Sequence, residues 1–277
     1  MKLLKYPTQA EWDEIVALGP GVRMFRGKKT LFYNGEKLRF GGFASLIYDE
    51  EERNTWQVMI VLPGVEMIPC CTFYDCRNIK TVVMADTVKR IEREAFMQCF
   101  GLQFVKLSTN LEFIGERAFC DCGFLTSIFI PPSCREIDWG AFFACKKLLI
   151  LGLPHNVQLG QDVFQDTELL RVSPFETDED GEYNEHDEEA VVQWVKSITN
   201  EEAYALHHLC CSHDPDEIYR YVKAHGLRAM KLPNKIGITP SQYLAANPYF
   251  KIEEGKFLKR YVLEMMGEVV VQEHAQI

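Results

Sequence analysis

A regular 23-residue period in the middle of the chain constrains its fold more than any other feature. Phenylalanine marks the period, and only the last interval is one residue shorter; the positions are Phe73, Phe96, Phe119, Phe142 and Phe164. Three residues after each of them stands a small side chain, and these positions are Cys76, Cys99, Cys122, Cys145 and Thr167. A period of this length is typical of solenoids, in which each repeat packs only against its neighbours.

Each repeat also contains a short segment in which apolar residues alternate. The alternating pairs are Met59/Val61, Val82/Met84, Val105/Leu107, Ile128/Ile130 and Leu151/Leu153. Alternation of this kind predicts one β-strand per repeat, with every second side chain directed into the core. Because one repeat cannot bury its apolar set alone, we predict an α/β solenoid of five stacked repeats. Its strands should pair in parallel within one sheet and begin near residues 58, 81, 104, 127 and 150.

The repeats resemble a known class. The run from Thr126 to Ile137, followed by Gly140-Ala-Phe-Phe-Ala-Cys145, resembles the BspA-like class of leucine-rich repeats. Over most of its length, including Arg260 to Gly267, the chain is similar to an abundant leucine-rich-repeat family of unicellular algae, diatoms especially. This resemblance implies a binding fold, and it transfers neither a ligand nor a catalytic residue.

The segment before the repeats predicts a cap for the first of them. Thr8 and Glu11 form a capping box that opens a short helix, which should end at Gly19-Pro20. Asn34-Gly35 is a typical hairpin turn between residues 31–33 and 38–40. We therefore divide the chain into a cap at 1–55, the repeats at 56–175, an acidic linker at 176–190 and a helical region at 191–277.

Helical spacing of apolar residues follows the acidic linker. Helices are expected to begin at Ala205, Asp216 and Pro240. The run Gly237-Ile-Thr-Pro240 resembles the ankyrin repeat, in which Gly-x-Thr-Pro-Leu-His opens each helix pair. The resemblance implies an α-helical, ankyrin-like region of two imperfect units, and a closing helix is expected within residues 253–273.

Acidic charge is concentrated in the linker. Nine acidic residues and no basic ones lie between Glu176 and Glu189, and removing them from the formal net charge of −10 leaves about −1. The remainder lacks the basic stripe that nucleic acid requires, so no nucleic-acid partner is expected. The acidic run imitates a calcium loop, but Tyr183 stands where an EF-hand needs glycine. A solvated linker is the simpler interpretation.

Cysteine and histidine residues of the chain are candidate metal ligands. Four of the ten cysteines share one register position of the repeats, which favours a ladder of buried free thiols; they are Cys76, Cys99, Cys122 and Cys145. The run His207-His-Leu-Cys-Cys-Ser-His213 places His207 and Cys211 on one helix face, as a zinc site would. The ankyrin resemblance implies instead that His207 binds a turn. We expect no cofactor, and the alternative function is a metal- or calcium-responsive regulator that uses this cluster or the acidic linker.

Signatures of enzymes and membrane proteins are missing from the sequence. It contains no glycine-rich phosphate loop, no Gly-x-Ser-x-Gly and no His-Glu-x-x-His. The longest apolar run, from Val58 to Leu62, is far below the roughly 20 residues that span a membrane. Met1 to Pro7 lacks the apolar stretch of a secretion signal. We therefore expect a non-catalytic protein that is soluble and cytoplasmic.

The strand residues that alternate with the inward positions are the candidate binding site. They are mostly apolar, whereas a merely solvated sheet face would be polar. The candidates are Ile60, Val83, Phe104, Lys106 and Phe129. We predict that a protein partner of unknown identity docks on this face. Two alternatives stay open, since the N-terminal cap or a second copy of the chain would also cover it.

Overall fold

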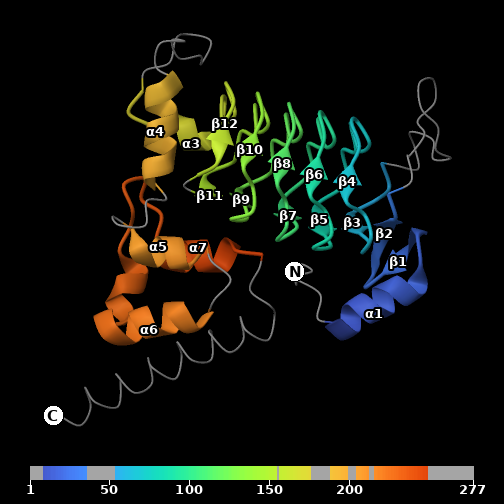
Figure 1. Cartoon of the computed structure of the whole chain (residues 1–277), viewed down its shortest axis with the longest axis horizontal. Coiled ribbons are helices and arrows are strands. Elements are labelled where there is room, and N and C mark those ends of the chain that lie inside the picture. The colour runs from blue at the N-terminus through green and yellow to red at the C-terminus, as the bar shows by residue number, and fades with distance from the viewer. Residues whose placement is uncertain are drawn as a thin grey trace. The chain divides into compact units, whose positions relative to one another are not determined.

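The computed structural model describes residues 9–35, 54–154, 156–175, 188–198, 204–211 and 215–248. The chain divides into two compact units (Figure 1). The repeat unit comprises Gln9–Ser197, and the C-terminal unit begins at Ile198.

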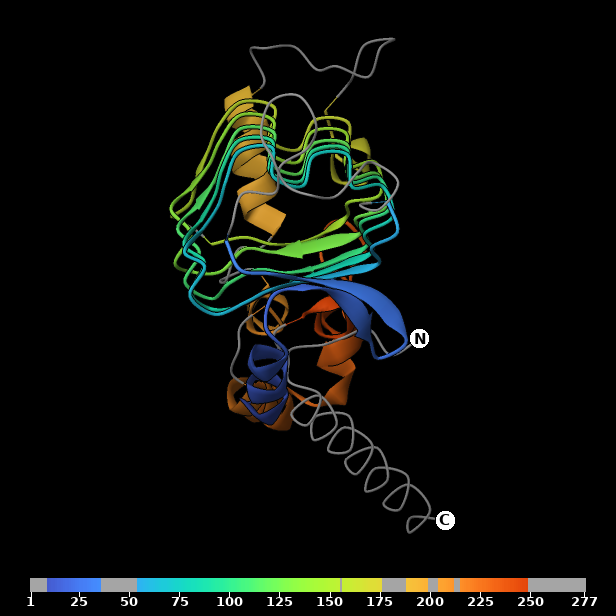
Figure 2. The same cartoon turned by 90° about the vertical axis from the view of Figure 1, so that its right-hand side faces the viewer.

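One strand per repeat forms the first layer of the solenoid. These strands are β3 (Val58–Val61), β5 (Thr81–Met84), β7 (Phe104–Lys106), β9 (Ser127–Phe129) and β11 (Ile150–Gly152). Their first residues are the predicted ones, and every pairing between them is parallel. In Figure 2, which looks along the stack, the outlines of successive repeats superimpose. The parallel β-solenoid predicted from the alternation is confirmed.

The prediction that these five strands form one sheet is wrong. Pairing joins β3, β5 and β7, and separately β9 and β11, but not β7 to β9, although those two strands remain neighbours. Pro131, directly beyond β9, contributes to the break because proline has no N–H to donate. Two repeats earlier, the equivalent N–H of Ala85 donates to the Val61 carbonyl at 3.1 Å.

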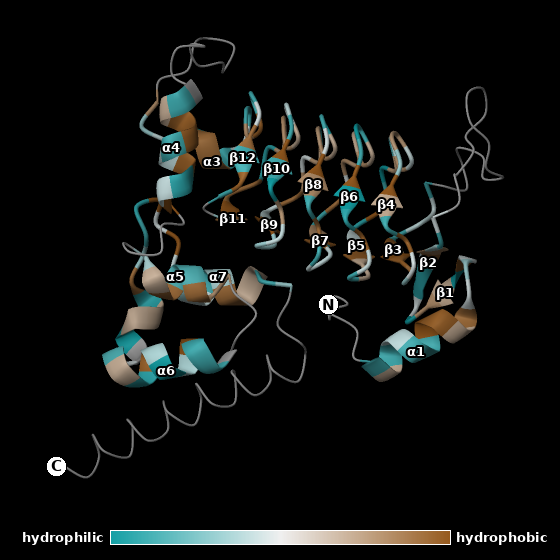
Figure 3. Cartoon of the chain, viewed as in Figure 1, coloured by the Kyte–Doolittle hydropathy of each residue, from teal (hydrophilic) through white to brown (hydrophobic). Residues whose placement is uncertain are grey.

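A second parallel sheet forms another side of the solenoid. Its strands, in spatial order, are β4 (Met67–Ile68), β6 (Arg90–Ile91), β8 (Phe113–Ile114), β10 (Glu136–Ile137) and β12 (Gln158–Leu159). The first residue of each strand is exposed or half-buried. In β4, β6, β8 and β10 the second residue is an isoleucine, and it is buried. Figure 3 shows brown, apolar residues on first-layer strands such as β3 and β11, whereas β6 and β10 of the second layer also carry teal, polar residues.

Two turn positions in every repeat adopt the left-handed region of backbone space. One set is Cys71, Glu94, Arg117, Gly140 and Asp162, and the other is Asp75, Gln98, Asp121, Ala144 and Asp166. In the first four repeats their N–H groups reach the next repeat; for example, Gln98 N donates to Cys120 O at 2.8 Å and Asp121 N to Phe143 O at 2.9 Å. Only one of these eight residues is glycine, so inter-repeat hydrogen bonds offset the cost of this conformation at the other seven.

A stack of phenylalanine rings runs through the core. Successive ring centroids lie 5.1, 5.1, 5.4 and 5.8 Å apart from Phe73 to Phe164. Tyr33 closes the N-terminal end, with its ring edge-on to Phe73 at 5.0 Å. The register of the period therefore places equivalent aromatic rings in direct contact between repeats.

The cysteine ladder is confirmed as buried free thiols. Each of three thiols donates to the carbonyl of a phenylalanine in the preceding repeat: Cys99 to Phe73, Cys122 to Phe96 and Cys145 to Phe119, at 3.2, 3.3 and 3.1 Å. Thr167 takes this position in the fifth repeat. Its hydroxyl accepts from Leu170 N and caps α3 (Glu168–Arg171), which ends the ladder with a helix.

The N-terminal cap consists of α1 (Gln9–Leu18), β1 (Gly21–Phe25) and β2 (Lys28–Tyr33). The helix agrees with the prediction, although its capping residue Thr8 lies outside the described residues. The hairpin is elsewhere: it joins β1 to β2 through Arg26-Gly27, both of which have positive φ. The second predicted hairpin strand, residues 38–40, lies outside the described residues; the two edges of β2 are paired with β1 and β3.

Helix α4 (Glu188–Ile198) covers the other end of the stack. Val191 and Val195 line a small space together with Leu159, Val163 and Phe164 of the last repeat. The proposed boundary between the acidic linker and the helical region falls inside this helix, and residues 176–187 lie outside the described residues. The two compact units meet between Ser197 and Ile198, at the end of α4.

The C-terminal unit is helical. It contains α5 (Ala205–Leu209), α6 (Pro215–His225), the 3-10 helix η2 (Leu227–Lys231) and α7 (Pro240–Ala246). Helices α5, α6 and α7 begin within one residue of the predicted positions, and Thr239 with Gln242 forms a capping box before α7. The closing helix falls outside the described residues. No helix in the described ranges is long and apolar enough to cross a membrane.

Candidate functional site

The predicted binding row on the strands is buried. Ile60, Val83 and Lys106 are 0% exposed, Phe129 is 2% and Phe104 is 9% exposed. The prediction of an open apolar face is therefore wrong. Strands β3 and β5 are buried at every position, as parallel strands are when both faces of the sheet are covered. The role of this row in binding a partner stays a prediction, and a partner has no access to it in this structure.

Lys106 links two neighbouring repeats through hydrogen bonds in the interior of the protein. Its ammonium donates to the Met84 carbonyl at 3.0 Å and to the Asp86 carboxylate at 2.7 Å. Asp86 also accepts from Thr109 N at 2.9 Å. Burial lowers the pKa of Lys106 to about 8, and the neighbouring Asp86 opposes that shift. The one polar member of the candidate row thus serves the fold.

Lys106 is expected to make stability rise with pH over a defined window. Its pKa is about 8 in the folded chain and 10.5 when unperturbed, so the unfolded state binds more protons between these values. Between pH 7 and 9.5, wild type should gain about 2 kcal/mol of unfolding free energy relative to Lys106→Met. Urea denaturation of both proteins at the two pH values measures this difference. An unchanged difference would show that the ammonium is not desolvated; Lys147→Met, at a partly exposed lysine, is the control.

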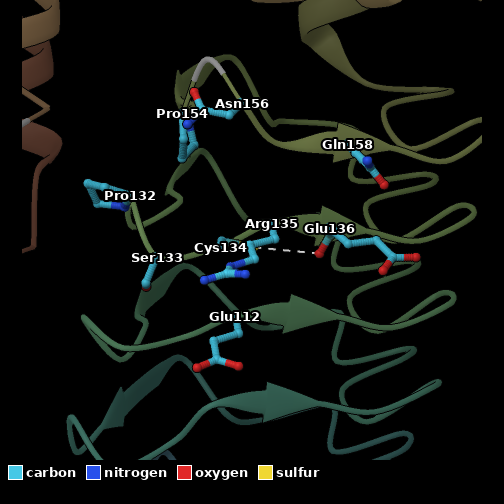
Figure 4. A pocket seen from close by; sticks show the side chains of 9 residues that line it. All are labelled: Glu112, Pro132, Ser133, Cys134, Arg135, Glu136, Pro154, Asn156 and Gln158. Atoms are coloured by element: carbon cyan, nitrogen blue, oxygen red, sulfur yellow. Dashed lines mark hydrogen bonds between the residues drawn. The ribbon is translucent and has the colours of Figure 1, made fainter.

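A hollow on the surface of the repeat unit lies at its third to fifth repeats (Figure 4). We call it the turn groove. Its volume is about 670 Å³, and it is lined by Glu112, Pro132, Ser133, Cys134, Arg135, Glu136, Pro154, Asn156 and Gln158. These residues come from the turns after β9 and β11 and from the starts of β8, β10 and β12.

The turn groove lies where two turns of unequal length meet. Phe129 pairs with Gly152 in the first layer, and Glu136 pairs with Gln158 in the second. The connection in the fifth repeat is therefore one residue shorter than in the fourth, which accounts for the shortened last interval of the sequence period. The shorter interval is visible in the sequence, but the sequence alone does not link it to a surface hollow.

The turn groove offers charged and amide groups for binding. Arg135 and Glu112 are exposed, and in Figure 4 the guanidinium and this carboxylate lie on the same side, whereas Glu136 points the opposite way. Asn156 and Gln158 add amide donors and acceptors at the rim. Such a set suits a ligand with polar or charged groups.

Neither nucleophile-type residue of the turn groove is arranged for catalysis. The Ser133 hydroxyl is close to the carbonyls of Thr109 and Leu111, at 2.9 and 2.7 Å, and no base contacts it in the described ranges. Burial raises the pKa of the Cys134 thiol to about 12, so it remains protonated at neutral pH. The groove can therefore bind a polar or charged ligand, but it has no activated serine or cysteine.

Among the metal-ligand candidates that fall within the described ranges, no cluster is assembled. His207 Nε2 lies 2.9 Å from the Ile238 carbonyl, and Cys210 is buried with a pKa raised to about 12 by burial. Ser212 and His213 lie outside the described residues, as does most of the acidic run. Within the described ranges, no group of three or more His, Cys, Asp or Glu side chains is placed to hold a metal ion.

Residues 62–177 match a protein family described as "BspA type Leucine rich repeat region", in six copies. This stretch of the chain is thus similar to repeats of the BspA type. The match covers less than half of the chain and leaves the C-terminal unit outside it. No curated protein sequence is significantly similar to the chain. The similarity to algal proteins and the ankyrin-like character of the C-terminal unit remain predictions.

Three solved structures resemble the repeats. A leucine-rich-repeat protein of T. pallidum is 20% identical, with 55% of this chain and 67% of that chain covered and a TM-score of 0.39. A leucine-rich cell surface protein from Faecalibacterium prausnitzii is 24% identical (50% and 36% covered, TM-score 0.37). A leucine-rich-repeat protein from Bacteroides ovatus is 22% identical (54% and 49% covered, TM-score 0.36). This chain thus spans half or less of the last two, and the likeness carries no argument about function.

Proposed function

We propose that the chain is a non-catalytic protein-binding module and that the turn groove receives a loop of its partner. Repeats of this type are generally interaction modules, whose extended surfaces suit recognition. The observation that carries the proposal is the exposed pair of Arg135 and Glu112 in an open hollow of about 670 Å³ without an activated nucleophile. The ankyrin-like interpretation of the C-terminal unit, if correct, would add a second binding surface.

A loop with charges of both signs is the occupant that fits this groove. Arg135 would bind a carboxylate, and Glu112 an ammonium or guanidinium group. Addition of a partner strand is disfavoured because β10 pairs with β8 on one edge and with β12 on the other. Recognition therefore rests on side chains rather than on a backbone ladder.

Flanking surface must contribute to the interface. A stable complex needs about 800 Å² per partner, which exceeds what one groove supplies. Four residues at equivalent positions of successive repeats form a charged row that leads into the groove, and their charges alternate: Glu66, Lys89, Glu112 and Arg135. Glu66 and Lys89 form an ion pair at 3.4 Å. Exposed ion pairs of this kind contribute little to stability, so the row is available for electrostatic complementarity.

We further propose a reducing, intracellular setting for this interaction. All ten cysteines are free thiols. Proteins of oxidising compartments usually pair their cysteines, whereas thiols persist where glutathione keeps them reduced. Fractionation of native cells with an antibody against the chain tests this proposal.

Arg135→Glu is expected to weaken partner binding by about 10–100-fold, because it removes the cation of the turn groove and places a third carboxylate there. The partner is first identified by cross-linking in native extract, and its dissociation constant is then measured with purified proteins by calorimetry. The matched control is Arg171→Glu, a 66% exposed arginine side chain on α3.

Equal dissociation constants for wild type and Arg135→Glu would exclude the turn groove as the binding site. Sedimentation of the chain alone tests the remaining alternative of self-association. If a dimer forms and Arg135→Glu dissociates it, a second copy is the occupant and the proposed heterologous partner is wrong.

A further inference from the structure

Two cysteines of the first repeat lie outside the buried ladder and next to each other on the surface. Cys70 and Cys71 are both exposed, and their Sγ atoms lie 3.3 Å apart. They open the turn after β4, where Cys71 has a positive φ of 54°. The Cys71 N–H donates to Arg93 O at 3.0 Å, so the second repeat holds this turn in place.

The second repeat also orients the thiol of Cys71. Its sulfur donates to Glu94 Oε2 at 3.4 Å, and Arg93 binds the other oxygen of that carboxylate at 2.9 and 3.0 Å. Burial, contact with Cys70 and contact with Glu94 together raise the pKa of Cys71 to about 12. The Cys71 thiol therefore stays protonated at neutral pH and reacts slowly with reagents that need a thiolate.

A direct disulfide between these neighbours would be difficult to form. Adjacent Cα atoms lie about 3.8 Å apart across a trans peptide. Disulfides usually require about 4.4–6.8 Å between the Cα atoms. One atom inserted between the sulfurs lengthens the bridge and relieves this constraint, so the pair suits a ligand held by both sulfurs better than it suits oxidation.

We propose that Cys70 and Cys71 form a two-sulfur binding site for a thiophilic trivalent centre, for which arsenic(III) is the probe. Ions such as zinc prefer four protein ligands, and no group of three or more ligating side chains is assembled in the described ranges. A centre that needs only two sulfurs has no such requirement. With phenylarsine oxide, two As–S bonds form, the As–O bond breaks, and both thiol protons leave with that oxygen as water. Arsenic stays trivalent, so no oxidant or reductant is needed.

Intact mass spectrometry of the reduced full chain with phenylarsine oxide tests the proposal. Wild type should carry one phenylarsenic group that resists excess 2-mercaptoethanol and leaves on addition of a dithiol. Cys70→Ser and Cys71→Ser should each lower the affinity at least about 100-fold, because closure of the second bond is then lost. Cys211→Ser is the matched control, since Cys210 and Cys211 are also adjacent but Cys210 is buried.

Four outcomes would overturn the proposal. Wild type that retains no arsenic against the monothiol lacks a two-sulfur site. Arsenic retention in the Cys70→Ser/Cys71→Ser double variant would place the site elsewhere. Loss of arsenic retention in Cys211→Ser would assign the site to Cys210 and Cys211. Retention in either single variant shows that one sulfur is enough.

Discussion

Phe119→Ala is expected to lower the unfolding free energy of the repeat unit by about 3–5 kcal/mol, the usual cost of emptying a buried aromatic position. The Phe119 side chain is fully buried, and its ring stacks on Phe96 at 5.1 Å and on Phe142 at 5.4 Å. Because each repeat contacts only its neighbours, a cavity in the third repeat also weakens the coupling between the two halves of the stack. The urea transition should therefore broaden or split.

Tryptophan fluorescence measures this effect selectively, because all four tryptophans lie within residues 9–197. Phe124→Ala is the control in the same repeat. Its side chain is 49% exposed and contacts Lys147, so its removal should change the unfolding free energy by less than about 1 kcal/mol. Equal effects of the two substitutions would show that the phenylalanine stack does not hold the repeats together.

Raising the pH above 9 is expected to unfold the repeat unit. Burial raises the pKa of the Cys134 thiol to about 12, and burial with the neighbouring Asp121 does the same for Cys120. Burial also raises the pKa of Cys99 and Cys122 well above the ordinary value of 9.0. These four thiols keep their protons in the folded chain, whereas they ionise near pH 9 in the unfolded chain. The stability that they contribute is thus complete below pH 9 and is lost as the pH rises.

Each of these thiols lowers the free energy of unfolding by about 1.4 kcal/mol per pH unit. Lys106 raises it by a similar amount up to its unperturbed pKa of 10.5. The net loss is roughly 4 kcal/mol per pH unit above pH 9, against a total stability of about 5–15 kcal/mol for a typical domain. Urea denaturation at pH 8, 9 and 10 with a reductant measures it. Cys122→Ala should reduce the slope by about 1.4 kcal/mol per pH unit. A stability that is constant to pH 10 would mean that the buried thiols ionise without unfolding.

The repeat architecture could be predicted from the sequence because periodicity is a local property. Residues that recur every 23 positions meet their equivalents in the next repeat, which makes Phe96 stack on Phe119 and places Cys99 one rung from Cys122. The first residues of the strands followed from apolar alternation for the same reason. The left-handed turn positions had no comparable signal, since one glycine, Gly140, is accompanied by residues as different as Arg117 and Ala144.

The candidate site depended on information that a period does not contain. Alternation separates the two faces of a strand, but it does not say whether the second face is covered, and Ile60 and Val83 are buried on it. Likewise, the break between β7 and β9 and the turn groove depend on how neighbouring turns meet in space. The sequence by itself determined the stack, its strands and its thiol ladder, because these follow from repeated local patterns. Only the tertiary structure decided which surfaces are open, because exposure depends on everything that packs against a residue.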